Sequence, residues 1–446
     1  PLFVLALGRP ETTSVFPGLW SERRLETLHL GDLLPRQSEE LVLSVLGALV
    51  SAADLDRMVD RAAGNAFFLQ ELVRAFAEGE RDGTPETVLA MVGARIERLD
   101  PAARRLLQAA SAFGQSFWIE GARALLGGDL APGAVDEAID ACVRRELLVR
   151  RRTSRIEGCT EIAFRHALVR DAARAMVADD ARAAVHLRVA EWLESAGEHD
   201  MAVLAEHFER GGDAARAVEA YRRASAQALE GNDFATAIDR AEAAVAAGAQ
   251  GEALGLLRSL QAEAHGFRDE HGQAKARGDE AMRLLAPGSA AWCAAALDVA
   301  RASASQMEID DLVAVAEQVR ALDPSEPRPH HLTSAARIVT YLCGADRPAE
   351  AGRLLERAEQ LVRHPGAAGT TALAWLHHAR AWTAFCAGDA ATSLRGEELS
   401  VLAFERAGDE RNACYIRVGL GHAYREVGAL AEAEQSLRDA LRTAER

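Results

Sequence analysis

Residues 191–446 repeat a pattern of small and larger apolar residues at helical spacing, and this repetition constrains the fold more than any other feature. Small residues at fixed points let the backbones of two antiparallel helices approach closely. The pattern therefore predicts a stack of helix pairs. In the last copy, GLGHAYREVGALAEAEQSLRDAL, the predicted packing residues are Leu420, Gly421 and Tyr424 on the first helix and Ala433, Leu437 and Ala440 on the second.

The second-helix spacing recurs upstream, with turn signals such as GGD, GND and AGD between copies. From Ala237 onward, successive anchors lie 37 to 43 residues apart. This exceeds the roughly 34 residues of a tetratricopeptide repeat (TPR) unit, so we expect longer helices or turns. The spacing favours a TPR-like superhelix, although alanine periodicity alone is shared by other helical repeats. Further second-helix anchors are predicted at Ala351, Leu355 and Ala358, at Ala217, Tyr221 and Ala224, and more weakly near Ala237, Ala274, Leu312 and Leu394.

Residues 81–190 predict helices followed by a small hairpin, which is the plan of a winged-helix domain. Asp100-Pro101 is a strong helix start, because Asp caps the helix and Pro is tolerated in its first turn. Strands are expected at 147–155 and 160–166, joined by a turn around Glu157-Gly158, with helices before and after them.

Residues 1–80 predict the tail of an α/β domain. LFVLAL, residues 2–7, has the apolar density of a strand buried on both faces, and LETLHL, residues 25–30, suits a second strand. Helices are expected near 37–49 and on both sides of Gly64-Asn65. The predicted fold is thus mainly α, in three parts: 1–80, 81–190 and 191–446. The opening PLFVLALG is interpreted as an internal point of a longer chain rather than as a signal peptide.

Composition excludes several classes of function. Apolar runs are far shorter than the roughly 20 residues of a membrane span. Net charge is −16, of which −3 falls in residues 1–190 and −13 in the remainder, so a general phosphate-backbone binder is not expected. The six cysteines form no CxxC pair. We expect reduced thiols, no zinc site and a cytoplasmic location.

The only lysine, Lys275, lies in GQAKARGD. A P-loop needs a glycine-rich backbone followed by Lys and Ser/Thr, because the ammonium reaches the terminal phosphates and the hydroxyl holds magnesium. The sequence around Lys275 lacks both features. We therefore expect no catalytic residue, no cofactor in this chain and no ATP hydrolysis by it alone.

Two other groups of residues are interpreted without a ligand. Adjacent histidines, His330-His331 and His377-His378, are not expected to share a metal, because neighbours in a helix do not face one another. A basic cluster resembles a nucleic-acid-binding wing, but acids lie close by and aromatics are not interleaved. We interpret it as a solvated face or domain contact; its members are Arg144, Arg145, Arg150, Arg151, Arg152 and Arg155.

Four segments occur in a familiar order: LALGRPE, GNAFFLQELV, RIERLDPAARRLLQAASAFGQSF and FRHALVRDAA. Together they resemble the C-terminal part of a bacterial STAND/AAA-type regulatory ATPase, the group that includes LuxR-type large regulators and kinase- or cyclase-fused TPR proteins. The second segment is similar to the family's GNPFFLEELV, with Ala66 in place of the proline that helps to shape the adenine contact.

The resemblance implies nucleotide contacts in an intact parent that binds ATP or ADP with magnesium. Arg9 would read the γ-phosphate, and His166 would touch the β-phosphate and favour the ADP-bound state. Gly64, Asn65 and Phe67 would border the adenine. Each residue also has an alternative: an exposed arginine after a strand, a histidine within the winged-helix core, and a helix-ending glycine followed by a capping asparagine.

The predicted function is a regulatory scaffold in signal transduction, including transcription regulation. Nucleotide state would set how its parts pack, the TPR solenoid would bind a protein or small effector, and the activated parent would oligomerise. No direct nucleic-acid or membrane contact is expected of this region. Two alternatives stay open: a plain TPR adaptor with an inert ATPase remnant, and an ATP-hydrolysing enzyme in the intact protein.

Overall fold

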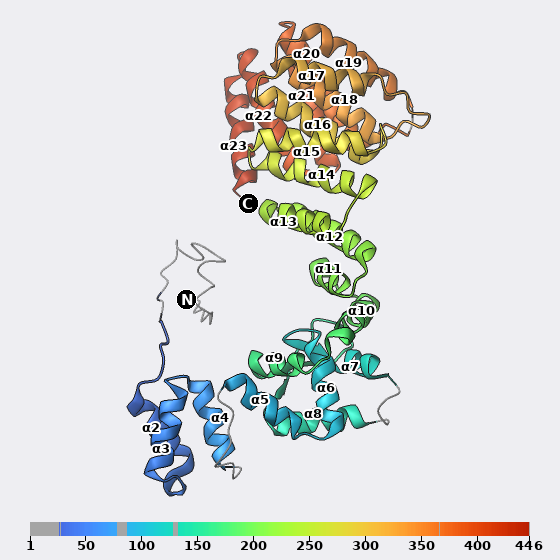
Figure 1. Ribbon diagram of the computed structural model, residues 1–446. Helices are drawn as coiled ribbons and strands as arrows, with labels where there is room; N and C mark the ends of the chain where they lie inside the picture. The colour runs from blue at the N-terminus through green and yellow to red at the C-terminus, as the bar shows by residue number, and fades with distance from the viewer. Residues whose placement is uncertain (1–25, 27, 78–86, 128–132, 365, 446) are drawn as a thin grey trace. The chain divides into compact units, whose positions relative to one another are not determined.

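The computed structural model describes residues 26, 28–77, 87–127, 133–364 and 366–445, which are mainly helical with one small three-stranded sheet (Figure 1). The chain divides into two compact units. Unit 1 comprises Pro1–Phe117, Gly128–Arg152 and Ile162–Val177, and unit 2 comprises Trp118–Gly127, Thr153–Glu161 and Ala178–Arg446. The sequence-predicted boundary between 190 and 191 falls inside helix α10 (Asp179–Ser195).

The described part of unit 1 includes a group of short helices around an apolar core. Ser51 accepts a hydrogen bond from the Asp54 amide and so starts the second of them. Large side chains such as Leu69, Leu72 and Val42 form the core. The elements are α2 (Pro35–Leu46), η1 (Gly47–Leu49), α3 (Ala52–Ala62), α4 (Ala66–Ala77) and α5 (Val88–Glu97).

The sheet lies among three further helices of unit 1, α6 (Pro101–Ser111), α8 (Ala134–Arg144) and α9 (Ala167–Ala175). Its strand order is β1-β3-β2. Strands β2 (Leu148–Arg150) and β3 (Glu161–Phe164) pair antiparallel, with Leu148 opposite Phe164. The predicted hairpin is therefore present, with strands shorter than expected. Strand β1 (Ser116–Trp118) was not predicted, because three residues are too few for a periodic signal.

Two strands predicted near the N-terminus have different outcomes. LFVLAL, residues 2–7, lies outside the described residues, as does Arg9. In LETLHL, the described residues Glu26, Leu28, His29 and Leu30 are coil, and the prediction of a strand there is wrong. Leu28 and Leu30 are 80% and 92% exposed, so neither gains the burial that would stabilise a strand.

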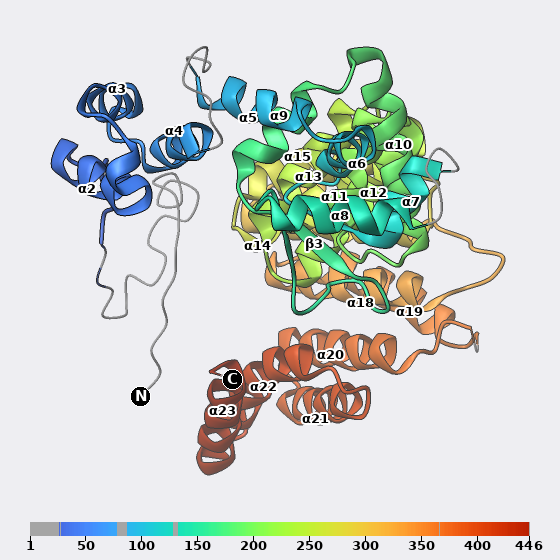
Figure 2. The ribbon, with the colours of Figure 1, turned by 90° about the horizontal axis from the view of Figure 1, so that it is seen from below.

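Unit 2 is an array of helices in which each packs against the next and alternate helices from α12 to α20 also touch (Figures 1 and 2). Its elements are α7 (Ile119–Leu126), α10, α11 (Met201–Arg210), α12 (Ala214–Glu230), α13 (Phe234–Ala246), α14 (Gly251–Phe267), α15 (His271–Leu284), α16 (Ala290–Ser305), α17 (Ile309–Arg320), α18 (Pro329–Gly344), α19 (Pro348–Leu361), α20 (Thr370–Cys386), α21 (Ala390–Arg406), α22 (Glu410–Glu426) and α23 (Leu430–Ala444).

A recurring turn joins many of these helices, and the sequence explains it. One residue adopts a left-handed backbone, as Asn232 does at φ 59° and Gly388 at φ 80°. The next residue is often Asp, whose carboxylate accepts a backbone N–H of the following helix; Asp233 caps α13 and Asp389 caps α21 in this way. The GND and AGD signals are therefore turn-and-cap units.

The predicted packing residues mostly lie between helices. Leu355 and Tyr424 pack partly buried against the core of the array. Leu437 differs: it contributes to the wall beside Gly421 but is 42% exposed, because α23 has no following helix in the described part of the chain to cover it. The buried members are Ala217, Tyr221, Ala224, Ala351, Ala358, Leu420, Gly421, Ala433 and Ala440.

The predicted register needs one correction. Ala217 lies on α12, and Ala237 lies on the next helix, α13. The anchors near Ala274, Leu312 and Ala351 lie on α15, α17 and α19, alternate helices that follow α13. The Ala217 set therefore belongs to a first helix, not a second one. The spacing of small residues alone does not distinguish a first helix from a second one, because both helices of a pair pack closely against a neighbouring helix.

One aromatic contact connects distant members of the array. Phe267, at the end of α14, stacks on Phe234 with ring centroids 5.0 Å apart. The guanidinium carbons of Arg301 and Arg411 lie 5.5 and 4.8 Å from the Phe267 ring centroid. Arg411 belongs to α22, so this cation–π contact joins helices that are far apart in sequence. Across the described ranges, no helix has both the length and the apolarity to cross a membrane.

Candidate functional site

The Gly64-Asn65 turn joins α3 to α4 through local backbone contacts. Ala63 and Gly64 both have positive φ, 45° and 82°. The Gly64 carbonyl accepts the Leu33 amide at 2.8 Å, and a Cβ on Gly64 would lie 2.7 Å from Asp32 Cβ. Asn65 Oδ1 accepts the Phe68 amide at 2.9 Å. The turn and the cap thus account for these two residues without a ligand.

Phe67 and His166, two predicted nucleotide contacts far apart in sequence, meet within unit 1. Their ring centroids are 4.6 Å apart. Burial lowers the pKa of His166 below its usual range, and the nearby Arg165 and Arg74 lower it further while Glu71 opposes them. The imidazole is therefore neutral near pH 7, with one N–H to donate.

Charged residues around His166 were missed by the sequence analysis. Glu71 is buried, and both of its carboxylate oxygens lie 3.1 Å from Arg95 Nη1. Arg74 lies between Glu71, at 3.5 Å, and Glu146. The sequence did carry one indication of these arginines, which is the glutamate in the apolar run FFLQELV. A glutamate in such a run is expected to be buried, and a buried carboxylate requires a cationic partner.

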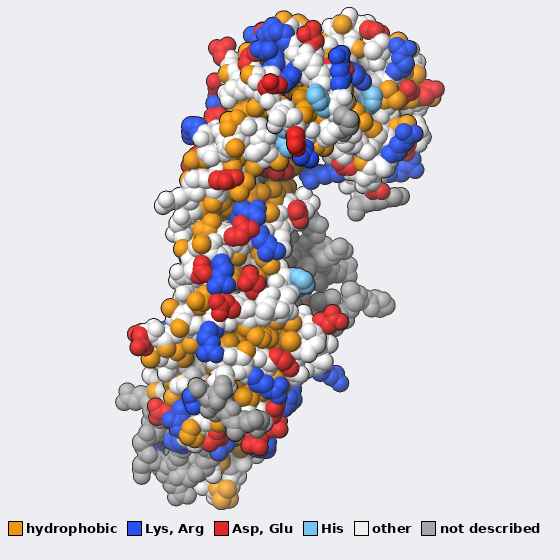
Figure 3. Space-filling view, turned by 90° about the vertical axis from the view of Figure 1, so that its right-hand side faces the viewer, with side chains coloured by type: hydrophobic (Ala, Val, Ile, Leu, Met, Phe, Trp, Pro, Cys, Tyr) orange, Lys and Arg blue, Asp and Glu red, His pale blue; other side chains and the backbone are white. Residues whose placement is uncertain are grey.

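The basic cluster is exposed, and two of its members have acidic partners. Arg150 pairs with Asp140 at 2.7 Å. Arg155 lies 4.0 Å from Glu198 and 5.3 Å from the Trp118 ring centroid. The face of the molecule in Figure 3 likewise intersperses basic and acidic side chains. These contacts favour the interpretation as a solvated face.

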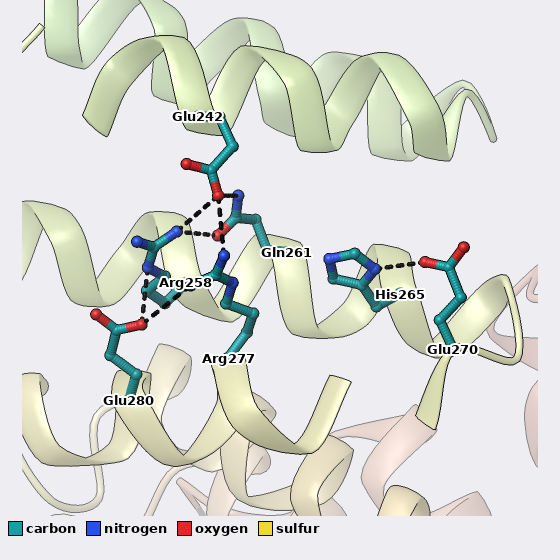
Figure 4. A network of polar contacts seen from close by, with 7 residues as sticks. All are labelled: Glu242, Arg258, Gln261, His265, Glu270, Arg277 and Glu280. Atoms are coloured by element: carbon teal, nitrogen blue, oxygen red, sulfur yellow. Dashed lines mark hydrogen bonds and ion pairs between the residues drawn. The ribbon is translucent and has the colours of Figure 1, made fainter. Parts of the chain in front are cut away.

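A polar network spans α13, α14 and α15 in unit 2 (Figure 4). Arg258 Nη1 donates to Glu242 Oε1 at 2.9 Å and to Gln261 Oε1 at 2.6 Å. Arg258 Nε lies 2.9 Å from Glu280 Oε2, an ionic contact that lacks hydrogen-bond alignment. Arg277 contacts Glu242 at 3.2 Å and Glu280 at 3.4 Å. Each carboxylate of the network thus contacts both guanidinium groups.

Pairing is also visible in the pKa of Glu242. Burial acts to raise it, but the hydrogen bond from Gln261 and the charges of Arg258 and Arg277 outweigh burial, so the pKa is lowered. On α14, His265 Nδ1 lies 2.6 Å from Glu270, and this contact lowers the pKa of Glu270. These groups are used in joining helices rather than in holding a ligand.

A second set of charges on α14, α16 and α18 is less completely paired. Asp298 is buried and contacts Arg301 at 2.6 Å. Burial raises its pKa to about 7, with a further rise from Glu263. Burial also raises the pKa of Glu263, although Arg301, Arg337 and Arg411 lower it. Within the described residues, neither Glu263 nor Arg337 has an ion pair, so this set retains unpaired charge.

A cavity of about 480 Å³ lies between α16, the start of α18 and the start of α20. Leu297 and several alanines form one wall. The opposite walls are polar, with His330 and Arg337 from α18 and Thr371 from α20. The Arg337 guanidinium lies 4.6 Å from the ring centroid of Trp375, a residue of α20. The volume lies within the range of small-molecule sites.

His330 and His331 do face one another, contrary to the sequence expectation. Their ring centroids are 4.2 Å apart, and both Nε2 atoms reach the Gly288 carbonyl, at 3.2 and 2.8 Å. Side chains of a helix tilt toward its N-terminus, so both rings turn back to Gly288 from the first turn of α18. In the other pair, His378 Nδ1 lies 2.9 Å from Glu397.

With Cys293, these histidines form a group whose ligand atoms lie within 4.8 Å of one another. His331 Nδ1 accepts the Arg328 amide at 3.0 Å, so Nε2 carries the proton donated to Gly288. A metal-ligating imidazole normally donates from its other nitrogen. Burial also raises the pKa of the Cys293 thiol to about 11. The tautomer and the thiol both disfavour a metal here.

No protein-family model and no curated protein matches this sequence. Among solved structures, the chain is similar to the Signal Transduction ATPase with Numerous Domains (STAND) protein with a tetratricopeptide repeat sensor from Pyrococcus horikoshii, at 13% identity and TM-score 0.42. That likeness covers 93% of this chain but 54% of the other, so the chain spans about half of its length.

The chain is also similar to the P58(IPK) TPR domain, at 13% identity and TM-score 0.26, over 89% of this chain and 98% of that one. These TM-scores are too low for either likeness to assign a fold or a function.

Proposed function

We propose that this chain is the regulatory part of a nucleotide-switched signalling protein of the STAND type. In this proposal, unit 2 is a TPR-like array that binds a protein or a small effector. The β2–β3 hairpin and its flanking helices form a winged-helix-like element in unit 1. Helical arrays expose extended surfaces suited to binding. The recurrence of small-residue anchors on alternate helices supports a TPR-like assignment with units longer than the usual one.

The observation that carries the nucleotide part of the proposal is the contact between Phe67 and His166, with ring centroids 4.6 Å apart. These two residues come from separate segments that resemble nucleotide-binding segments of one family. Phe67 would offer a ring face to a base, and the neutral His166 would donate one N–H to a phosphate oxygen. Arg74 and Arg95, already held by Glu71, would add positive charge nearby.

The chain supplies no phosphate-gripping loop, so a nucleotide with its magnesium would be held largely by residues outside it. An effector that binds one arrangement of the intact protein more tightly than another would shift the population toward it. The same proposal includes a cytoplasmic location and an output domain attached to the intact protein.

ADP affinity tests the nucleotide role. In a protein that joins this chain to a P-loop-bearing upstream segment, His166→Ala should weaken ADP binding about 10- to 100-fold, as expected for the loss of one hydrogen bond to a charged group. The matched control is His364→Ala, an exposed histidine of unit 2. This chain alone should not hydrolyse ATP, and turnover by purified material that Arg9→Ala abolishes would contradict that expectation.

The alternative function is a plain adaptor. The Gly64-Asn65 turn favours it, because local hydrogen bonds account for both residues. Unchanged ADP affinity in both histidine variants would leave the adaptor as the better description.

A further inference from the structure

The cavity between α16, α18 and α20 has a charge pattern that is unusual for this chain. The protein carries a net charge of −16. No acidic side chain is among the residues that line this cavity, whereas Arg337 and His330 are. A recess with a cationic wall and no lining carboxylate favours an anion over a cation.

Arg337 is the principal cation of the cavity, and its guanidinium is available. It lies over the Trp375 ring at 4.6 Å, and no carboxylate in the described ranges is within ion-pair distance. Of the nearby acids, Asp298 is already paired with Arg301 at 2.6 Å, and burial raises the pKa of both Asp298 and Glu263. A ring contact leaves the N–H edge of the guanidinium free to form a fork with phosphate oxygens.

Further donors come from α18 itself and from α20. His330 Nε2 donates to the Gly288 carbonyl at 3.2 Å, so the neutral ring has no second N–H to offer, and the additional donors are hydroxyls. Thr333 on α18 and both Thr370 and Thr371 on α20 add hydroxyls to the same walls. Residues 369–372, at the start of α20, line this recess, and this 17-residue helix has no side-chain cap. The positive end of a helix dipole favours negative charge near it.

The remaining wall is apolar. Leu297, Ala290 and Ala294 of α16 present only hydrocarbon to the cavity. About 480 Å³ is larger than a bare anion needs and lies within the range of small-molecule sites. The recess therefore suits a molecule with a charged group at one end and an apolar body at the other.

We propose that this cavity binds a small phosphomonoester, with its phosphate between Arg337 and the start of α20 and its organic part against α16. The inference rests on the proposed function only in taking unit 2 as the effector-binding part. It names the effector's chemical class and requires no nucleotide switch.

Calorimetric titration of the whole chain tests the proposal, with inorganic phosphate, phenyl phosphate and benzoate as probes. Phenyl phosphate should bind more tightly than inorganic phosphate, because the apolar wall adds contact. Arg337→Gln should weaken phenyl phosphate binding at least about tenfold, and Arg337→Lys should restore part of it. Arg320→Gln, at an exposed residue of α17 outside the cavity, should bind as the parent does.

A second variant guards against a folding artefact. Ala294→Leu keeps every donor but fills part of the cavity from an exposed position, so it should weaken phenyl phosphate more than inorganic phosphate. Benzoate binding as tightly as phenyl phosphate would overturn the phosphate assignment. Undetectable phenyl phosphate binding by the parent, or parent-like binding by a helical Arg337→Gln protein, would overturn the site itself. ADP binding through His166 could persist in either case, so failure here is distinct from failure of the proposed function.

Discussion

Two groups of polar side chains in unit 2 differ in whether their arginines form ion pairs with carboxylates. Between α13, α14 and α15, Arg258 and Arg277 lie between Glu242 and Glu280, and Gln261 completes the network. In the cavity beside α16, α18 and α20, Arg337 has a ring contact but no carboxylate partner in the described part of the chain.

The difference separates structural charges from available ones. A network that satisfies its own groups holds helices in register and offers little to a ligand, because a ligand would have to replace existing partners. A cation held in place by an aromatic ring keeps its hydrogen-bonding edge free. The same residue type should therefore matter mainly for stability in one region and mainly for binding in the other.

The largest change in stability is expected when an arginine of the paired network is removed. Arg258→Gln should lower the free energy of unfolding by about 2–4 kcal/mol, less than for a fully buried triad because both carboxylates keep some solvent contact. The measurement is urea denaturation followed by circular dichroism. Arg438→Gln, which removes an exposed pair with Glu434, is the matched control and should cost at most about 1 kcal/mol. Equal losses in the two variants would remove the distinction between the regions.

An intermediate effect is expected at Asp298. Its pKa is raised from 3.8 to about 7, chiefly by burial, so between these values the folded protein binds more protons than the unfolded one. The free energy of unfolding should therefore fall as pH rises from about 4 to about 7, by about 1–3 kcal/mol.

Asp298→Asn should make this pH dependence shallower in denaturation curves collected across the window. Some slope should persist, because Glu263 also has a raised pKa. If the free energy of unfolding of the variant has the same slope with pH as that of the parent, Asp298 is not its source. A free energy of unfolding that rises with pH in the parent over this window would also contradict the assignment.

The smallest effect on stability is expected at Arg337. Arg337→Gln removes a cation–π contact and should cost about 0.5–1 kcal/mol in the same urea assay. Its comparison is Arg258→Gln, the same substitution in the paired network. If the cavity variant loses as much stability as the network variant, Arg337 is a structural residue and the contrast between the two regions disappears.

Sequence reasoning predicted the helical array from features that are local. The spacing of Ala351 and Ala358 follows from helix periodicity, and Asp233 or Asp389 marks a capped turn within a few residues. The same reasoning predicted the β2–β3 hairpin. It placed Ala217 on the second helix of a pair, whereas the residue lies on the first. Both helices carry small residues, so their spacing does not distinguish the first helix from the second.

The candidate sites were harder to predict, since they depend on residues brought together by packing. The Phe67–His166 contact was suggested only by a family resemblance, and the arginines around Glu71 were missed. Nothing near Arg337 in sequence indicates that the start of α20 faces it. Adjacent histidines in mid-helix would diverge, but Pro329 starts α18 immediately before His330, and the first turn lets both rings reach one carbonyl.

The contact of Phe267 with Arg411 has a mechanical consequence. A stack of helix pairs joined only to neighbours behaves as a spring that lengthens when its ends are pulled. Here α14 also touches α22 through the Phe267 ring and the Arg411 guanidinium, 4.8 Å apart, so the helices between them are closed into a loop. Because Phe267 is 39% exposed, this contact adds about 0.5–1 kcal/mol to the energy of separating α14 from α22, beside the contacts between alternate helices.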